Sequence, residues 1–258
     1  DISFSVSRGE TWSLVGESGC GKSTTALSLL RLLPESAARI EGGSIRWKGK
    51  DLLALSAKRL REIRGKEIAM IFQEPMTSLN PVISVGRQIS EAVLIHHLSS
   101  PKVAKELAIE AMQEVGIPSP RECFDHFPHQ LSGGMRQRIV IAMALSCGPS
   151  LLVADEPTTS LDVTIQAQVL ELIARARDKN QMGVILITHD LGVVSEVADR
   201  IAVMYAGVIV ETASARTLLS HPRHPYTEAL CQALWQGESS ARTRRLPVIP
   251  GKVPFFET

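Results

Sequence analysis

The sequence predicts an α/β fold with a largely parallel sheet, and three observations support this prediction. Apolar segments typical of strands alternate with longer segments of helical periodicity along the 258 residues. A glycine-rich stretch, residues 16–23 (GESGCGKS), follows a short apolar run. A second apolar run, residues 151–154, ends in the adjacent carboxylates Asp155 and Glu156. Both arrangements are typical of loops at the carboxyl ends of buried strands.

The first third of the chain is expected to alternate between the two kinds of element. β-prone apolar runs predict strands, and the segments between them have helical character or end at a breaker such as Pro34. The predicted elements are the strands Ile2–Val6, Thr11–Val15, Gly43–Trp47 and Ile68–Phe72, and the helices Lys22–Leu32 and Ala57–Arg64.

The pattern turns helical from Val82 to about Leu131 and then returns to alternation. A proline at the first position of one of these helices favours its start there. The predicted helices are Gly86–His97, Pro101–Val115, Gly133–Ser146 and Val163–Lys179; a strand begins at Leu151, another spans Gly183–Thr188, and Ile201–Tyr205 and Val208–Glu211 form a hairpin that turns at Ala206-Gly207.

Composition excludes several classes of function. The apolar fraction of 44% can form a core, and the net charge of +1 gives no basic field that would favour nucleic acid as a partner. No apolar run reaches the roughly 18–20 residues of a membrane span. The four cysteines have no metal-ligand spacing, and the sequence favours Cys20 as a small residue that fits its loop.

The glycine-rich loop has the pattern G-x-x-x-x-G-K-S, which binds the phosphates of a nucleotide. Glycines at 16, 19 and 21 allow the backbone to approach a phosphate, and a helix that begins near Lys22 directs its free N–H groups to the same place. Lys22 is expected to reach the β- and γ-phosphates of ATP, and the Ser23 hydroxyl to contact Mg²⁺. The residues expected to bind nucleotide in this loop are Gly16, Ser18, Gly19, Cys20, Gly21, Lys22, Ser23 and Thr24.

Other polar residues follow apolar strands. Gln73 comes after Ile68–Phe72, where its amide can bind Mg²⁺ or a water; alone, it could equally be a surface glutamine. His189 follows Gly183–Thr188 and would lie near the γ-phosphate if that strand neighbours the strand that begins at Leu151. Shortly after the carboxylates, Ser160-Leu161-Asp162 could signal across a dimer interface or cap the next helix; both can hold.

Residues 131–138 read LSGGMRQR, just before the paired carboxylates. With the phosphate loop, Gln73, the run LLVADEP, the SLD segment and His189, this order resembles the nucleotide-binding domains of ABC transporters over essentially the whole chain. The resemblance implies a P-loop NTPase (RecA-like) core with an antiparallel β subdomain and an inserted α-helical subdomain at 82–146. The ATPase domain would span 1–236, and 237–258 would be a C-terminal extension or linker of a longer protein.

The resemblance also implies roles for individual residues. Asp155 would hold Mg²⁺ through water together with Ser23 and Gln73. Glu156 would be the general base, with His189 and Gln73 assisting at the γ-phosphate and the attacking water. Ser132, Gly133 and Gly134 would bind the ATP held by a second ABC ATPase domain, in a homodimer or heterodimer. A preceding strand with an aromatic residue that stacks on adenine is expected before the given sequence.

Two further segments resemble ATPases of dipeptide, oligopeptide, nickel and glutathione importers: residues 72–81 (FQEPMTSLNP), and residues 224–230 (HPYTEAL) with 249–251 (IPG). Peptide import is therefore expected, with nickel, another small solute or a non-transport ABC protein as alternatives. The implied partners are two membrane-spanning permease subunits and a periplasmic or extracellular solute-binding protein, at the cytoplasmic face of the inner membrane. Met76, Leu79 and Pro81 are expected to dock a permease helix, or alternatively to pack within the chain.

Overall fold

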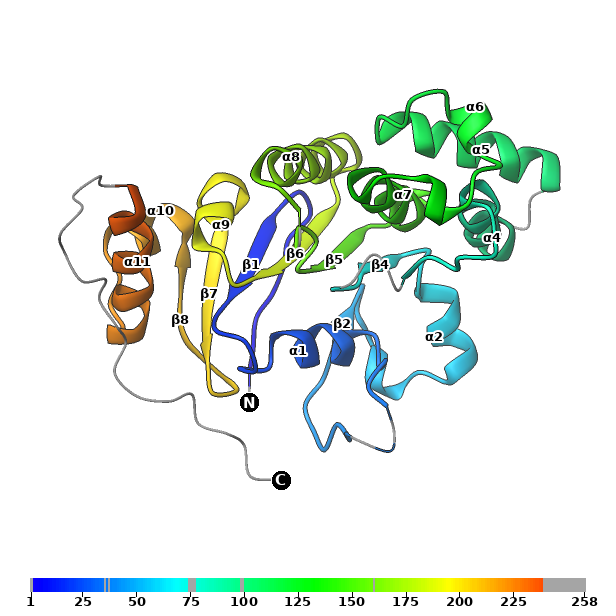
Figure 1. The fold of residues 1–258 in the computed structure, drawn as a ribbon. Coiled ribbons are helices and arrows are strands. Elements are labelled where there is room, and N and C mark those ends of the chain that lie inside the picture. Colours follow the sequence, from blue (N-terminus) through cyan, green and yellow to red (C-terminus); the bar gives the residue numbers. More distant parts are fainter. Residues whose placement is uncertain are drawn as a thin grey trace.

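The computed structural model describes residues 2–34, 36, 38–73, 78–97, 100–159 and 161–238. Its centre is a six-stranded sheet in which five neighbouring strands are parallel and the strand at one edge is antiparallel. Figure 1 shows helices on both faces of this sheet. In their order across the sheet, the strands are β4 (Ile68–Ile71), β5 (Leu151–Asp155), β6 (Gly183–Thr188), β1 (Thr11–Val15), β7 (Arg200–Tyr205) and β8 (Val208–Ser214).

The side chains of the central strands alternate between two cores. On β5, Leu152 and Ala154 belong to the larger core, whereas Val153 belongs to the core on the opposite face. This alternation follows from the two-residue period of a strand that is buried on both faces. Helices α7 (Gly133–Leu145) and α8 (Val163–Asn180) lie on one face of the sheet, and α1 (Lys22–Leu29) lies on the opposite face (Figure 1). Residues of α7 and α8 belong to the larger core, whereas Ala26 of α1 belongs to the opposite one.

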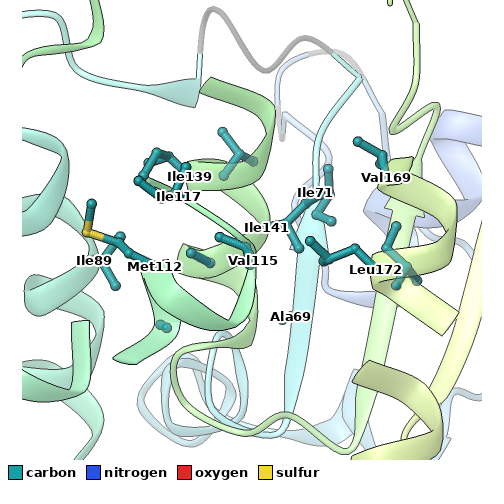
Figure 2. Close-up of a cluster of buried hydrophobic side chains, with 14 of the residues drawn as sticks. Ala69, Ile71, Ile89, Met112, Val115, Ile117, Ile139, Ile141, Val169 and Leu172 are labelled. Atoms are coloured by element: carbon teal, nitrogen blue, oxygen red, sulfur yellow. The ribbon is translucent and has the colours of Figure 1, made fainter. Parts of the chain in front are cut away.

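The larger core continues from the sheet into a lobe of helices. Figure 2 shows Ile139 and Ile141 of α7 between Met112 of the lobe and Ile71 of β4. Because α7 packs on both sides, it joins the lobe to the sheet through a continuous apolar contact. The other helices of the lobe are α4 (Val85–His97), α5 (Pro101–Glu114), α6 (Pro120–Cys123) and the short η2 (Pro128–Gln130).

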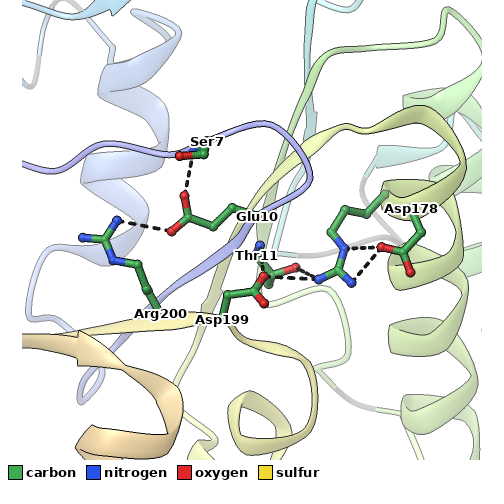
Figure 3. Close-up of polar contacts among 7 residues, drawn as sticks. Ser7, Glu10, Thr11, Asp178, Asp199 and Arg200 are labelled. Atoms are coloured by element: carbon green, nitrogen blue, oxygen red, sulfur yellow. Dashed lines mark hydrogen bonds and ion pairs between the residues drawn. The ribbon is translucent and has the colours of Figure 1, made fainter.

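A polar network fixes the amino ends of β1 and β7 (Figure 3). The carboxylate of Asp199 accepts a hydrogen bond from the backbone N–H of Thr11 at 2.7 Å. Arg177, near the end of α8, donates to the Thr11 hydroxyl at 2.8 Å and lies 3.4 Å from the Asp199 carboxylate. Nearby, Arg200 of β7 pairs with Glu10 at 3.2 Å. These contacts fix the position of α8 relative to the amino ends of the two strands.

The remaining elements lie around the sheet. Residues 46–63 form a small antiparallel pair and two short helices, and residues 191–238 add three helices. None of the helices in the described part of the chain is long and apolar enough to cross a membrane. These elements are β2 (Arg46–Trp47), β3 (Lys50–Asp51), η1 (Leu52–Ala54), α2 (Ala57–Ile63), α9 (Leu191–Val197), α10 (Ala215–Ser220) and α11 (Pro225–Glu238).

The predicted fold class is confirmed. The condition set for His189 is also met, because β5 pairs with β6 in the sheet. The strand predicted at Ile2–Val6 is wrong: its residues alternate in burial, but the segment has no ladder partner among the residues that the structure describes. Alternation there reflects packing of the side chains on the core, where Phe4 stacks on Trp12 at 4.1 Å between ring centroids.

Three element boundaries differ from the prediction by three residues. The strand predicted at Val208–Glu211 continues to Ser214, because its pairing with β7 extends that far. The strand predicted at Gly43–Trp47 is only two residues long, because its pairing with β3 begins at Arg46. Helix α1 ends at Leu29 instead of Leu32, because Arg31 takes a positive φ of 50° that no helix accommodates. Helices α9, α10 and α11 were not predicted. Their apolar residues are buried by packing against strands that are distant in sequence, and a local pattern does not show this packing.

Candidate functional site

The phosphate-binding loop lies between β1 and α1, and glycine is required at different positions of this loop for different reasons. Gly19 and Gly21 take positive φ angles of 82° and 107°, which residues with a side chain rarely adopt. At Gly16 the restriction is space, because a Cβ atom there would lie 2.3 Å from the backbone oxygen of Met204. The loop therefore packs closely on β7 and still leaves its outer side, at Gly19, open.

Lys22 folds back over this loop. Its ammonium group donates hydrogen bonds to the carbonyl oxygens of Gly16 and Glu17, both at 2.8 Å, and the residue is 5% exposed. Lys22 also begins α1, whose first turn has no capping side chain and no acidic residue. A buried cation beside free helix N–H groups makes this end of the sheet an attractive place for an anion.

Asp155 ends β5 in a buried position. It is 3% exposed, and its Oδ1 atom has no hydrogen-bond partner within the described part of the chain. Burial raises the pKa of Asp155, while the hydrogen-bonding hydroxyl of Ser23 and the charge of Lys22 act in the opposite direction. A carboxylate oxygen without a partner costs free energy unless a cation or donor completes it.

The oxygen donors here fit Mg²⁺ in particular. Mg²⁺ is usually held by one or two carboxylates, by water and by substrate phosphates, so a dedicated protein cage is not needed. Asp155 and the Ser23 hydroxyl supply donors of this kind. Among the described residues, no cluster of three or more His, Cys, Asp or Glu side chains could hold a metal ion. The site therefore suits a cation that arrives with a polyphosphate.

Glu156 is the centre of a second group of polar side chains. Its Oε2 atom accepts a hydrogen bond from the Thr159 hydroxyl at 2.9 Å and a longer one from the Gln73 amide at 3.4 Å. Its Oε1 atom lies 3.2 Å from Nδ1 of His189. These residues come from the ends of β4, β5 and β6, which are neighbours in the sheet.

The backbone conformation of Glu156 is unusual, and its pKa is shifted. Its φ angle is +47°, a conformation that is strained for a residue other than glycine. Burial alone would raise the pKa of Glu156, but hydrogen bonds from His189 and Thr159 outweigh it, so the pKa lies below its ordinary value. The carboxylate thus stays ionised at neutral pH and can accept a proton from a positioned water.

A cleft of about 380 Å³ lies between the phosphate loop and the Glu156 group. Gly16 and Ser18 of the loop line it, together with Gln73, Glu156 and His189. Ser132, Gly133 and Gly134 are not among the described residues that line it: they lie at the start of α7, where the first two are exposed. Of the residues expected to act together, the structure brings Gly16, Ser18, Gln73, Glu156 and His189 to one cleft. Asp155 and Lys22 are not among the described residues that line it, and the 132–134 segment also lies outside.

The start of α7 is well ordered by its own contacts. The Ser132 hydroxyl accepts a hydrogen bond from the N–H of Met135 at 3.3 Å and so caps the helix. A Cβ atom at Gly133 would meet no described atom within 4 Å, so packing within this chain does not require a glycine there. Farther along α7, the fully buried amide of Gln137 donates to the carbonyl of Pro157, directly after Glu156.

Two neighbouring segments, around Leu79 and Asp162, had been given expected roles. The docking role expected for Leu79 is wrong, because its side chain is 3% exposed and belongs to the larger core. Asp162 caps α8, as one of the two interpretations held, by accepting from the N–H of Ile165 at 2.9 Å. Met76 and Ser160 lie outside the described residues.

Sequence reasoning missed three residues that contact the site. Thr159 bonds Glu156, Gln137 bonds the turn behind it, and the hydroxyl of Tyr226 accepts a hydrogen bond from the N–H of Glu17 in the phosphate loop. Gln137 and Tyr226 stand inside the segments LSGGMRQR and HPYTEAL. Their positions in these segments were the only available signal, because the contacts themselves join residues far apart in sequence.

Comparison with known families agrees with this geometry. The family model described as ABC transporter matches residues 1–159, and the model described as oligopeptide/dipeptide transporter, C-terminal region, matches residues 210–258.

Among curated relatives, a probable peptide ABC transporter ATP-binding protein (y4tR) of Sinorhizobium fredii is 55% identical over 253 residues, which are 98% of this chain and 75% of that protein. The oligopeptide transport ATP-binding protein OppD of Bacillus subtilis is 52% identical over 98% of this chain and 70% of its own length. The dipeptide transport ATP-binding protein DppD of Bacillus subtilis is 55% identical over 89% of this chain and 68% of its own length.

A solved structure has the same fold. The dimeric ATP-binding cassette MJ0796, in a post-hydrolysis state bound to ADP and Pi, superposes with a TM-score of 0.74 and 25% sequence identity. The superposition covers 84% of this chain and 90% of that one.

Proposed function

The chain belongs to the ABC transporter family as an ATP-hydrolysing cassette, and we propose that it energises the import of peptides across the cytoplasmic membrane. The main support for peptides as the transported solute is the match of residues 210–258 to the oligopeptide/dipeptide transporter C-terminal region. Relatives named for peptide, oligopeptide and dipeptide transport support it.

In the proposed reaction, the loop from Gly16 to Thr24 binds the triphosphate of ATP through its backbone N–H groups. Lys22 exchanges its two carbonyl partners for the β- and γ-phosphates, since a phosphate is the stronger acceptor for an ammonium group. Ser23, Asp155 and Gln73 would hold Mg²⁺, which when bound neutralises charge on the phosphates. The unpartnered Oδ1 atom of Asp155 supports this assignment.

Glu156 is proposed as the general base. A carboxylate is ionised at neutral pH, and the cleft-lining position of Glu156 leaves it accessible to a water beside the γ-phosphate. His189 and Thr159 orient the carboxylate, and Gln73 senses it through the 3.4 Å contact. Positioned general bases contribute roughly 10²–10⁴-fold in rate.

The segment Ser132–Gly134 is proposed to bind the ATP of a second cassette. Its exposed helix N-terminus lies outside the chain's own cleft, and Gly133 is not needed for packing within the described chain. Such an N-terminus can bind an anion presented by a partner. MJ0796 is dimeric in its ADP-and-Pi state, which supports an analogous dimer here.

The further partners proposed are two membrane-spanning permease subunits and an extracytoplasmic solute-binding protein. The cassette itself would be bound peripherally at the cytoplasmic face of the inner membrane. In cells that lack this gene, expression of the wild-type chain should restore uptake of labelled di- and oligopeptides, whereas the variant Glu156→Gln should not. Restored uptake of nickel, with no effect on peptides, would contradict the proposed solute class.

The proposed site, in which the 132–134 segment of one cassette binds the ATP of the other, can be tested with two variants. Ser132→Arg should abolish hydrolysis by blocking the partner's nucleotide, and Lys22→Ala should abolish it by removing the phosphate contact. Mixing the two variants creates dimers with one intact site, so up to about a quarter of the wild-type activity should return. No return of activity would contradict a homodimer with shared sites.

A further inference from the structure

Helix α11 contacts the phosphate loop directly. The hydroxyl oxygen of Tyr226 accepts a hydrogen bond from the backbone N–H of Glu17 at 3.2 Å. Leu230, one helical turn later on the same face, lines the cleft that contains the loop. Both residues lie within 210–258, the region that matches the C-terminal model of oligopeptide and dipeptide transporters, and the reaction proposed above uses neither.

The start of α11 is held firmly in this position. The carboxylate of Glu211, on β8, accepts hydrogen bonds from the backbone N–H groups of Arg223 and His224, both at 2.9 Å. Nδ1 of His224 then accepts from the N–H of Tyr226 at 3.2 Å. Because these bonds fix the backbone just before the helix, the direction in which the Tyr226 side chain leaves it is defined.

Packing fixes the ring as well. Tyr226 is 7% exposed and belongs to an apolar core with Val15, the last residue of β1, and Val203 of β7. Its ring lies 4.7 Å from the ring of Tyr205, at an interplanar angle of 52°. The hydroxyl therefore reaches Glu17 from a rigid support, directly beside the point where β1 enters the loop.

The chemistry of the hydroxyl suits a place next to phosphates. Burial raises the pKa of Tyr226 to about 12, so the phenol remains neutral at physiological pH. A neutral oxygen can hold the Glu17 N–H without adding a negative charge near an anionic ligand, which a carboxylate in the same place would do.

Glu17 is restrained on both sides in the structure. Tyr226 holds its N–H, and the ammonium group of Lys22 holds its carbonyl oxygen at 2.8 Å. When Lys22 turns toward a phosphate, the carbonyl loses this restraint, whereas the N–H keeps the bond to Tyr226. Within the loop, the Glu17 carbonyl also accepts a longer bond from the N–H of Cys20 at 3.4 Å. The bond to Tyr226 is the one that ties Glu17 to α11, and it can persist in both the free and the nucleotide-bound loop.

We propose that Tyr226 is a positioning residue for nucleotide binding, through which α11 holds the phosphate loop in its binding conformation. The inference rests on the proposed function as an ATPase. It makes the C-terminal region a part of the nucleotide site, and it implies that displacement of α11 weakens the affinity for ATP.

The test compares Tyr226→Phe with the wild type and with Tyr205→Phe. The control removes the hydroxyl of the other ring of the pair, whereas the bond to Glu17 is made by Tyr226. Tyr226→Phe should weaken binding of ATP about 5-fold, the effect of one lost hydrogen bond. KM should rise by a similar factor with kcat unchanged, because Tyr226 touches no reacting atom. Tyr205→Phe should leave both constants as they are.

A reciprocal measurement distinguishes positioning from general stability. If α11 and nucleotide are coupled, a non-hydrolysable ATP analogue must slow hydrogen exchange of the α11 backbone in the wild type, and do so less in Tyr226→Phe. Equal effects of the two Tyr→Phe variants, or an unchanged affinity in Tyr226→Phe, overturn the inference alone. If the wild type binds ATP no better than Lys22→Ala does, the proposed function itself fails and this inference fails with it.

Discussion

Replacing Glu156 by glutamine is the sharpest test of the candidate site, because the substitution removes a charge and almost nothing else. The carboxylate has three polar neighbours: the Thr159 hydroxyl at 2.9 Å, the Gln73 amide at 3.4 Å and Nδ1 of His189 at 3.2 Å. A glutamine amide can keep all three. Its oxygen can accept from Thr159 and Gln73, and its NH₂ group can donate to Nδ1 of the His189 ring in the tautomer that leaves this nitrogen as an acceptor.

The expected effects on stability and on catalysis therefore separate. Because no buried polar group of Glu156→Gln loses its partner, the free energy of unfolding should change by less than about 1 kcal/mol. Hydrolysis should fall by roughly 10²–10⁴-fold, since the amide cannot take a proton from water. Binding of ATP should survive, because Lys22 and the loop are unchanged, and ATP should then hold the dimer closed.

The assay is phosphate release under single-turnover and steady-state conditions, with ATP affinity and urea unfolding measured on the same preparations. Glu106→Gln is the matched control, because Glu106 is a half-exposed glutamate that pairs with Arg121 on the helical lobe. It should hydrolyse ATP at the wild-type rate. Turnover of Glu156→Gln within about 3-fold of the wild type would refute the assignment of Glu156 as general base.

Three further predictions concern neighbouring features. Thr159→Val should raise the pKa of the Glu156 carboxyl, and an unshifted NMR titration of this carboxyl would contradict the prediction. Because the folded pKa lies below the unfolded one, the variant should lose stability above pH 4.5, and this loss should disappear as the pH falls through the folded pKa. Leu79→Ala should reduce the free energy of unfolding by about 3 kcal/mol in urea, because the side chain is buried in the larger core; a change near zero would mean that the residue is on the surface. Asp199→Ala should destabilise the fold by about 1–2 kcal/mol, because it leaves the N–H of Thr11 without its acceptor. Asp178→Ala breaks only an ion pair that involves an exposed carboxylate, and it should lose less than about 0.5 kcal/mol; equal losses would contradict the stabilising role of Asp199.

Most of the candidate site could be predicted from the sequence, because its parts are local. The glycine pattern of the loop, the lysine that starts α1 and the carboxylates that end β5 each depend on residues within one short segment. Strand and helix periodicity then located β1, β4, β5 and β6 to within a residue. The parallel arrangement gathered Gln73, Asp155, Glu156 and His189 at one edge, since carboxyl ends of parallel strands meet there.

Other properties depended on the tertiary structure. Residues 2–6 have the alternation of a strand, but hydrogen bonding in a sheet needs a partner that no local pattern supplies. Leu79 lies in a stretch of mixed polarity, and only the packing of the helical lobe decides that it is buried.

The same holds for the contact between α11 and the loop, which joins Glu17 to Tyr226 across 209 positions. Periodicity and propensity act over a few residues and therefore determined the elements and the chemistry of their ends. Which distant surfaces meet depends on the burial of the whole chain, so the link from the C-terminal helix to the phosphate loop was decided by the tertiary structure alone.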